Sequence, residues 1–475
     1  MKHLRILLIG LIAWGCATNP ATGKRQVMLM SEQQEISLGR ESDADVRKQM
    51  GVYNDANLQR YVTEVGDRLA KAAHRPTLPW TFTIVDEAAV NAFALPGGFI
   101  YLTRGIMPFL QNEAELAAVL GHEIGHVDAR HSAQQYSTQT LAGGGLALLG
   151  IFVPQTRPAQ GLAGLGLSAM FLKFSREDEL QADQLGVGYA STSGWDPRGM
   201  PGLLSTLARL DEASGSSRGV PNWQLTHPPA EDRVVKVQQI VSAQPTAGKV
   251  TNPSEFERYL DGMVFGDSRE KGIVRGNEFL HPVLRFALRF PQGWTVINSA
   301  EQVSAQRSDS SNAGMVLQLS NATGNLQQVA PAGMAQAGWR QITGARSTIN
   351  GLDAYVGTYE GTSNNTAVTV RAAHVRAGDQ TYIIAGIAPS GEFAASDDTF
   401  SSAIRTFRAL SAQEADRIQP NRVDFHVVRP GETWDSIAKS VGDGTIKAST
   451  LAIMNGTEAG VPPRAGDRVR VVIGG

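Results

Sequence analysis

Two histidines and a glutamate within residues 120–126 have the types and spacing of a metal site. His122 and His126 are four residues apart, so on a helix they lie on one face about one turn from each other. Two neutral imidazoles can then hold one Zn²⁺, with Glu123 beside them at the open side of the metal. This H-E-x-x-H pattern is typical of metal-dependent hydrolysis, in which the carboxylate takes a proton from metal-bound water whose pKa is lowered to about 7.

The segment around the motif must form a helix for this chemistry. Asn112 and Glu115 make a capping-box pattern at its expected start. Apolar residues then recur at helical spacing, at Leu116, Val119, Leu120 and Ile124. We therefore expect a helix of about 20 residues that carries both histidines on one face.

A catalytic zinc site also needs a third protein ligand and an open fourth position. Glu179 and Asp183 are again four residues apart, so a second helix can present one carboxylate to the metal. The other carboxylate, one turn along, can accept a hydrogen bond from a ligand imidazole. The alternative is a solvated acidic helix face with no metal.

At this point the chain resembles the M48 zinc metallopeptidases, the family that includes the CAAX prenyl proteases. Their H-E-x-x-H motif is followed by S-R-x-x-E-x-x-A-D, which is matched here by Ser175, Arg176, Glu179, Ala182 and Asp183. The resemblance covers roughly residues 20 to 245. It implies one Zn²⁺ held by His122, His126 and Glu179, with Glu123 as general base and Asp183 as support for a ligand imidazole.

Residues 91–101, with the sequence NAFALPGGFIY, resemble the family's strand before the zinc helix. Gly97 and Gly98 allow another backbone to approach closely, and an edge strand beside a metal site can bind an extended peptide by strand addition. A plain β-turn fits the local sequence equally well. With the resemblance, we expect Gly97, Gly98, Phe99 and Ile100 to bind the substrate.

His227 begins a His-Pro-Pro segment that resembles the H-P segment of the family. An imidazole there could stabilise the oxyanion that forms when a peptide carbonyl is attacked. Alternatively, it could swing in as a fourth zinc ligand and hold the enzyme latent. The remaining interpretation is a histidine at a helix start with no catalytic role.

The N-terminus resembles the signal of a bacterial lipoprotein. A short basic start is followed by an apolar run from Ile6 to Trp14, which is too short to span a bilayer, and then by Gly15 and Cys16. The resemblance implies cleavage before Cys16, acylation of that cysteine, and a place on the outer membrane facing the periplasm, since Ala17 and not Asp follows it. Ala13 and Trp14 depart from the usual pattern, so the alternative is an ordinary signal peptide. Cys16 is the chain's single cysteine, which excludes internal disulfides.

The rest of the chain indicates two further domains. The 475 residues are 42% hydrophobic, enough for two or three cores, and the net charge of −2 argues against nucleic acid as a partner. Alternating apolar residues near 286–290 and in three later segments predict strands, and the start F-P-x-G-W weakly resembles PsbP-like α+β domains. Residues 425–438, 451–456 and 463–469 resemble a LysM module, which implies a β-α-α-β fold and binding to the N-acetylglucosamine backbone of peptidoglycan.

The expected fold class is α+β, with a mainly helical zincin-type metallopeptidase domain that contains a small β-sheet. The expected order is a signal peptide at 1–16, a tether at 17–30, the M48-like domain at 31–245 and a linker at 246–269. An α+β accessory domain at 270–412, a linker at 413–423 and a LysM-like domain at 424–475 follow. The apolar stretches 141–153 and 161–174 are too short to span a membrane. We interpret them as helices buried in the core or packed over the cleft or, alternatively, as a flap that dips into the membrane or gates the substrate.

We therefore predict a zinc endopeptidase of the bacterial envelope that cleaves misfolded or stalled envelope proteins. The alternative is a latent protease that acts mainly as a chaperone-like binding scaffold on peptidoglycan.

Overall fold

The computed structural model describes residues 16–139, 174–214, 223, 227, 233–299, 302–307, 312–363, 366–442, 444–458 and 460–475. The expected signal at 1–15 and nearly all of the two apolar stretches lie outside these ranges. The chain divides into a first unit, residues 1–266 with 421–474, and a second unit, residues 267–420 with Gly475. Within the described ranges, no helix has both the length and the apolar character needed to cross a membrane.

The first unit contains a small sheet of β3 (Thr81–Val85), β5 (Phe99–Thr103) and β4 (Ala92–Leu95), in that spatial order. β5 runs parallel to β3 and antiparallel to β4. Alternate side chains of β5 enter different cores, because successive residues of a strand point to opposite faces. Ile100 and Leu102 pack with helices α3 (Ala56–Ala70) and α4 (Glu113–Asp128), and Phe99 and Tyr101 pack with α2 (Glu32–Met50).

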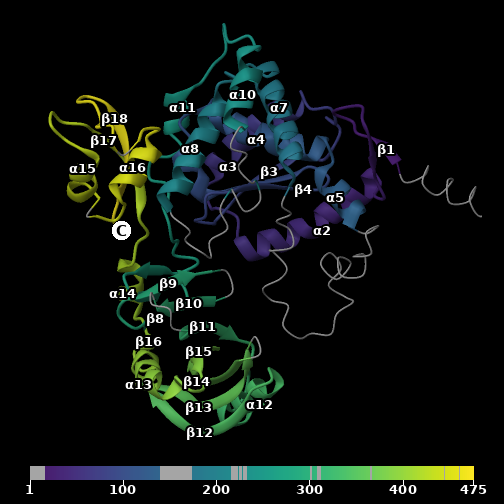
Figure 1. Cartoon of the computed structure of the whole chain (residues 1–475). Helices are drawn as coiled ribbons and strands as arrows, with labels where there is room; N and C mark the ends of the chain where they lie inside the picture. Colours follow the sequence, from purple (N-terminus) through teal and green to yellow (C-terminus); the bar gives the residue numbers. More distant parts are fainter. Residues whose placement is uncertain are drawn as a thin grey trace, which may run out of the picture. The chain divides into compact units, whose positions relative to one another are not determined.

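Helices α7 (Arg176–Thr192), α8 (Gly199–Ser214) and α10 (Arg233–Ser242) pack together beside α4 (Figure 1). Ser31 and Ser175 begin α2 and α7 with capping boxes, in which each serine and the residue three positions later exchange side-chain to backbone hydrogen bonds. The short helices η1 (Arg104–Phe109) and α5 (His131–Gln139) precede and follow α4. The zinc-motif helix is thus enclosed, and every one of its 16 residues is buried.

The expected tether at 17–30 is wrong in part, because this segment packs on the first unit. It contains two short paired strands, β1 (Cys16–Thr18) and β2 (Arg25–Val27). The Asn19 side chain is 4% exposed and donates to the Ala129 carbonyl oxygen at 3.0 Å. That carbonyl ends the zinc-motif helix, where backbone acceptors lack partners inside the helix. A side chain that satisfies one of them anchors the segment.

The expected linker at 246–269 is also structured. It contains α11 (Pro253–Glu257), and three of its apolar side chains, Phe256, Leu260 and Met263, belong to the main core of the first unit. Asn252 donates to Glu113 Oε1 at 2.8 Å, at the start of α4. These apolar side chains are buried in the core, whereas a free linker would leave them in water. Their burial fixes the segment in place.

Residues 421–474, here called the C-terminal module, form β17 (Arg422–Val427), α15 (Trp434–Ser440), α16 (Ala448–Met454) and β18 (Arg468–Ile473). β17 and β18 pair antiparallel, so the order is β-α-α-β. The module shares one continuous hydrophobic core with the rest of the first unit, including Leu451 and Ile453. It therefore does not form a separate body on a flexible connection.

One buried arginine fastens the C-terminal module to the segment that enters α4. Arg470 is 3% exposed and donates to the carbonyl oxygens of Pro108 at 3.1 Å, Leu110 at 2.6 Å and Gln111 at 3.0 Å, besides Met454 of its own module at 3.2 Å. Burial lowers the pKa of Arg470 to about 10, which leaves it charged at neutral pH. A charged donor shared among several carbonyls makes stronger hydrogen bonds than a neutral one.

The second unit is built on a seven-stranded antiparallel sheet in the order β12-β13-β14-β15-β11-β10-β9. Its strands are β9 (Trp294–Asn298), β10 (Gln302–Arg307), β11 (Gly314–Ser320), β12 (Arg340–Ile349), β13 (Leu352–Ser363), β14 (Thr366–Ala377) and β15 (Gln380–Pro389). Helix α13 (Phe393–Ile404) packs on one face and α12 (Leu326–Gln336) on the other.

A four-stranded sheet in the order β16-β8-β7-β6 completes the second unit. It consists of β6 (Ile273–Arg275), β7 (Glu278–His281), β8 (Phe286–Arg289) and β16 (Arg408–Ala409). The expected linker at 413–423 is wrong for its first half. Helix α14 (Ala412–Arg417) lies there, and Ala415 and Ile418 are buried against this sheet.

Candidate metal centre

Three glycines let α4 and α7 pack backbone against backbone. A Cβ atom on Gly186 of α7 would lie 2.8 Å from the His122 backbone nitrogen, and one on Gly125 of α4 would lie 2.9 Å from the Ala182 carbonyl oxygen. Gly121 faces Gly186 at a similarly short distance. Because glycine has no Cβ, the two helices approach closely enough for the carboxylates of α7 to reach the histidines of α4.

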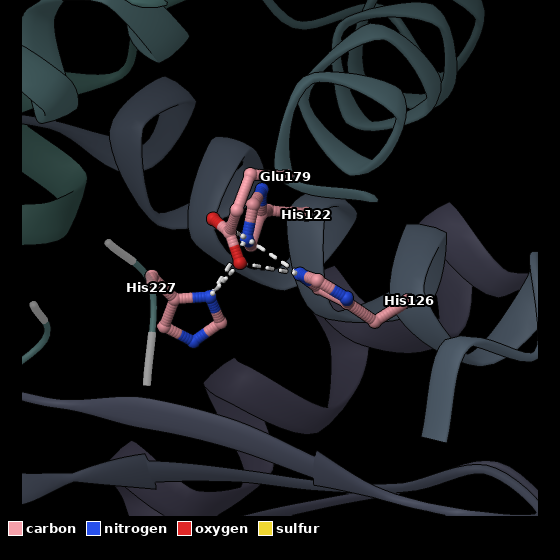
Figure 2. Close-up of side chains that lie close together, drawn as sticks. All are labelled: His122, His126, Glu179 and His227. Carbon is pink, nitrogen blue, oxygen red and sulfur yellow. Dashed lines mark hydrogen bonds and ion pairs between the residues drawn. The ribbon is translucent and has the colours of Figure 1, made fainter. Parts of the chain in front are cut away.

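Four buried side chains gather their donor atoms in one place: His122, His126, Glu179 and His227. All of these atoms lie within 4.8 Å of one another (Figure 2). His122 Nε2 is 3.0 Å from His126 Nε2 and 3.2 Å from His227 Nδ1. Glu179 Oε1 is 3.0 Å from His227 Nδ1 and 3.5 Å from His126 Nε2.

These spacings fit zinc. Tetrahedral zinc with bonds of about 2.0–2.1 Å places neighbouring ligand atoms about 3.3 Å apart. Two imidazole nitrogens at 3.0 Å, each with a lone pair available, suit a shared cation better than a hydrophobic core. The residues present therefore fit the metal that the motif predicts, with His122, His126 and Glu179 as ligands and His227 Nδ1 at the fourth position.

Asp183 and Arg233 hold the ligands in place. His122 Nδ1 lies 2.9 Å from Asp183 Oδ1, which leaves Nε2 free to face a metal. Arg233 donates to both oxygens of Asp183, at 2.5 and 2.8 Å, and its Nη1 lies 2.8 Å from Glu179 Oε2. Burial alone would raise the pKa of Asp183, but the charge and hydrogen bonds of Arg233 outweigh it and lower that pKa to about 2.

His131, five residues past His126, contacts a ring of the donor set. Its Nδ1 lies 2.9 Å from His126 Nδ1, and its Nε2 lies 2.8 Å from Gln181 Oε1. If His126 presents the lone pair of Nε2 to a metal, its Nδ1–H donates to His131, whose Nε2–H donates to Gln181. Burial lowers the pKa of His131, which keeps the ring neutral for this role.

Glu123 lies beside the ligands and is 1% exposed. Its Oε1 atom has no hydrogen-bond partner among the described residues, and His227 Nε2 lies 3.5 Å from it. Burial raises the pKa of Glu123, against the opposing charges of His227 and His122. A buried carboxylate oxygen without a partner is costly, so this atom calls for a partner beyond the described residues.

His227 is positioned by aromatic packing and by its own backbone. Its ring stacks on Trp223 with centroids 4.1 Å apart, and its backbone N–H donates to the Trp223 carbonyl oxygen at 2.8 Å. Trp223 in turn donates through its backbone to the Val90 carbonyl oxygen at 3.0 Å, just before β4. Phe174 stacks on His126 with centroids 4.1 Å apart. Two aromatic rings therefore flank the donor atoms.

The expected substrate residues do not lie on an edge strand. Phe99 and Ile100 belong to β5, which is hydrogen-bonded to β3 on one side and β4 on the other, so strand addition there is excluded. The glycines before β5 are explained by contacts inside the protein and not by a bound peptide. Gly97 has φ of +84°, and a Cβ there would lie 2.6 Å from the Ile36 Cα, so its close neighbour is α2. β3 and β4 are the two edge strands of this sheet.

Cys16, the expected lipidation site, begins β1 and pairs with Val27 of β2.

Glu115 does not complete a capping box with Asn112. Asn112 caps α4 by accepting from the Glu115 backbone N–H at 3.1 Å, whereas the Glu115 carboxylate accepts from the Gln111 backbone N–H at 2.9 Å. Burial raises the pKa of Glu115 to about 7.

Residues 56–241 match the model of peptidase family M48. The beta-barrel assembly-enhancing protease of Escherichia coli (strain K12) is 33% identical over 228 residues, which cover 46% of this chain and 46% of that protein. The mitochondrial metalloendopeptidase OMA1 of Arabidopsis thaliana is 30% identical over 206 residues, 43% of this chain and 41% of that protein. The chain therefore spans less than half the length of these curated relatives.

Among solved structures, cyanobacterial PsbP (CyanoP) from Synechocystis sp. PCC 6803 matches with 10% identity and a TM-score of 0.24, over 29% of this chain and 95% of that chain. A score this low is not evidence of a shared fold. The family match instead coincides with the helices that carry the two motifs and with their buried donor set. Over residues 56–241, this chain is similar to peptidase family M48.

Proposed function

We propose that this chain is a zinc-dependent endopeptidase. The observation that carries the proposal is the buried group of His122, His126 and Glu179, with the Glu123 carboxylate beside it. A structural zinc site has no need of such a carboxylate. The family match over these helices and the names of the two metalloproteases above support the same activity.

The chain's own residues account for the proton transfers. Zinc held by His122, His126 and Glu179 would polarise the scissile carbonyl and make water more acidic. Glu123 accepts the proton of the attacking water and then donates it to the nitrogen of the leaving amine. Asp183 fixes the His122 ring through its Nδ1–H, and Arg233 forms ion pairs with both Asp183 and Glu179 on α7.

In the geometry described, His227 restrains this activity. Its Nδ1 lies where a fourth ligand would lie, and a catalytic site must keep that position open for water or substrate. We propose that His227 holds the enzyme latent until it moves away. In this geometry His227 Nε2 lies 3.5 Å from Glu123 Oε1, and we propose that the imidazole, once it has left the fourth position, stabilises the oxyanion from beside Glu123.

Substrates and location follow from the relatives and from the N-terminus. We propose that the substrates are misfolded or stalled envelope proteins, a role supported by the name of the beta-barrel assembly-enhancing protease. Substrate would pair with β4, one of the two edge strands of the sheet, in place of the β5 residues first expected. Acylation of Cys16 would anchor the chain to the outer membrane on its periplasmic side, and residues 424–475 would bind peptidoglycan glycan.

The second candidate function is a chaperone-like scaffold that binds clients without cleaving them. His227 completes a set of four donor residues and leaves no position for water or substrate, which favours the scaffold function in the resting state. The scaffold predicts that client binding survives the loss of Glu123, and that removal of His227 releases no activity.

Zinc content and casein cleavage separate the two functions. The chain lacking residues 1–16 is compared with Glu123→Gln and His227→Ala, and His426→Ala in the C-terminal module serves as the histidine control. We expect about one zinc per chain, cleavage by the unmodified chain and by His426→Ala, none by Glu123→Gln, and faster cleavage by His227→Ala. Retained zinc and circular dichroism show that Glu123→Gln is folded.

If zinc is bound but neither casein nor an unfolded envelope protein is cut by any variant, the peptidase proposal is wrong and the scaffold takes its place. If no zinc is bound, the ligand assignment itself fails. Equal rates for His227→Ala and His426→Ala would contradict the latent state alone.

A further inference from the structure

The two faces of the seven-stranded sheet in the second unit are covered unequally. Phe400 and Ile404 of α13 pack on the face that includes Ala373, Val375 and Ile384 of β14 and β15. On the other face, α12 contacts β12 and β13 and reaches the neighbouring strands mainly through Met334. A groove remains on this face, between α12 and strands β11, β14 and β15.

This groove has the size and character of a site for an apolar ligand. Its volume is about 710 Å³, within the range of about 300–1,000 Å³ typical of ligand pockets. Its floor and walls are mostly apolar and include Val316, Trp339, Val370, Ile383 and Ile387. No Asp, Glu, Lys or Arg lies among the described residues that line it. A ligand with a charged group would lose its hydration there without gaining a partner.

One polar side chain lies deep in the groove. His374 is 2% exposed, and its Nδ1 has no hydrogen-bond partner among the described residues. Burial lowers the pKa of His374 to about 4, so the ring is neutral at physiological pH and has one nitrogen that accepts and one that donates. Buried polar groups in folded proteins are nearly always hydrogen-bonded, so an unpaired imidazole facing an apolar cavity indicates a missing partner.

We propose that this groove binds an uncharged amphiphile, an elongated apolar molecule with one hydroxyl, amide or carbonyl group that hydrogen-bonds to His374. The apolar walls bury the hydrocarbon portion, and the neutral imidazole fixes the orientation of the single polar group. The site lies wholly within the second unit and is independent of the proposed peptidase activity.

Gly333 of α12 offers a clean way to block the site. It lines the groove, and a Cβ atom added there would meet nothing within 4 Å, so Gly333→Leu projects into the groove without a backbone clash. Gly391 is a matched control in the same unit, because its Cβ would also be free and it does not line the groove. His374→Leu removes the polar partner and keeps an apolar side chain at that position.

Binding is measured with 11-bromoundecan-1-ol, whose bromine quenches tryptophan fluorescence, since Trp339 lines the groove. We expect saturable quenching at one site per chain, unchanged in Gly391→Leu and weakened at least tenfold in Gly333→Leu. His374→Leu should weaken binding of the alcohol about three- to tenfold, the value of one hydrogen bond. The charged analogue 11-bromoundecanoate should bind at least tenfold more weakly than the alcohol to the unmodified chain.

Quenching that does not saturate, or that is equal in Gly333→Leu and Gly391→Leu, would overturn the proposal. A preference for the carboxylate would also overturn it, because it would require a positive charge in the groove. Absence of quenching in the folded, unmodified chain would also overturn it, because the groove would then be closed to the alcohol.

Discussion

The close approach of α4 and α7 predicts opposite effects for two glycines that lie two residues apart on the same helix. A Cβ on Gly186 would lie 2.8 Å from the His122 backbone nitrogen and 2.9 Å from the Gly121 carbonyl carbon. Both atoms belong to the rigid backbone of the zinc-motif helix. A Cβ on Gly188 would meet nothing within 4 Å. Alanine should therefore raise helix propensity equally at the two positions, but only at Gly186 should it clash with the neighbouring helix.

The magnitudes follow from two opposing effects. Alanine in place of a helical glycine stabilises by about 0.5–1 kcal/mol, which is the whole expected effect for Gly188→Ala. At Gly186 the added carbon must push the helices apart, and overpacking of this kind costs about 1–3 kcal/mol. Gly186→Ala should therefore be less stable than Gly188→Ala by about 1–3 kcal/mol. It should also bind zinc about tenfold more weakly, because His122 moves relative to Asp183 and Glu179.

Urea unfolding of the zinc-free chain gives the stability difference, and competition with a chelator gives the zinc affinity. The two variants must be compared with the unmodified chain in both assays. If Gly186→Ala and Gly188→Ala agree in stability and in zinc affinity, the backbone contact does not position the ligands and the reasoning fails.

Three further predictions concern single side chains. Asp183→Asn should lower zinc affinity by about 10- to 100-fold in the chelator competition, because the acceptor of the His122 Nδ1–H loses its negative charge. An affinity equal to that of Glu177→Gln, at an exposed position, would contradict this. Arg470→Met should cost about 3–5 kcal/mol in urea unfolding, since at least three backbone carbonyls lose a charged donor, and a cost below 1 kcal/mol would show that the C-terminal module docks without it. His374 has a folded pKa of about 4 against about 6.5 when unfolded, so its neutral form stabilises the fold above pH 6.5 and this stability is lost as the pH falls toward 4. The free energy of unfolding of His374→Leu should therefore rise relative to that of the unmodified chain by up to about 3 kcal/mol as the pH is lowered from 7.5 to 4. A difference between the two chains that stays constant with pH would refute this.

Local sequence patterns were sufficient for much of the metal centre. The i and i+4 spacing depends only on helix geometry, so the sequence placed His122 beside His126 and Glu179 beside Asp183 on their respective helices. Capping residues are equally local, and Asn112 begins α4 where expected. In the second unit, alternating apolar residues located three long strands within a few residues, at 352–363, 366–377 and 380–389.

The tertiary structure decided which of these residues meet. The approach of His131 to His126 and of Arg233 to Asp183 depends on how helices far apart in the sequence pack. The same packing brings His227 to the fourth position, which the sequence left as one alternative among three. The pairing order of the small sheet, which excludes β5 as an edge, depends on hydrogen bonds between segments and not on the residues of one strand.

The sequence by itself determined the ligand types, their helical spacing and the chemistry they suit, because these depend on side-chain identity and on the 3.6-residue repeat of the helix. Only the tertiary structure decided that residues 17–30 and 246–266 are packed and not free, and that the C-terminal module shares the core of the first unit. These contacts join residues up to about 360 positions apart, such as Arg470 and Leu110. Burial of such pairs depends on the whole chain at once, and no local pattern encodes it.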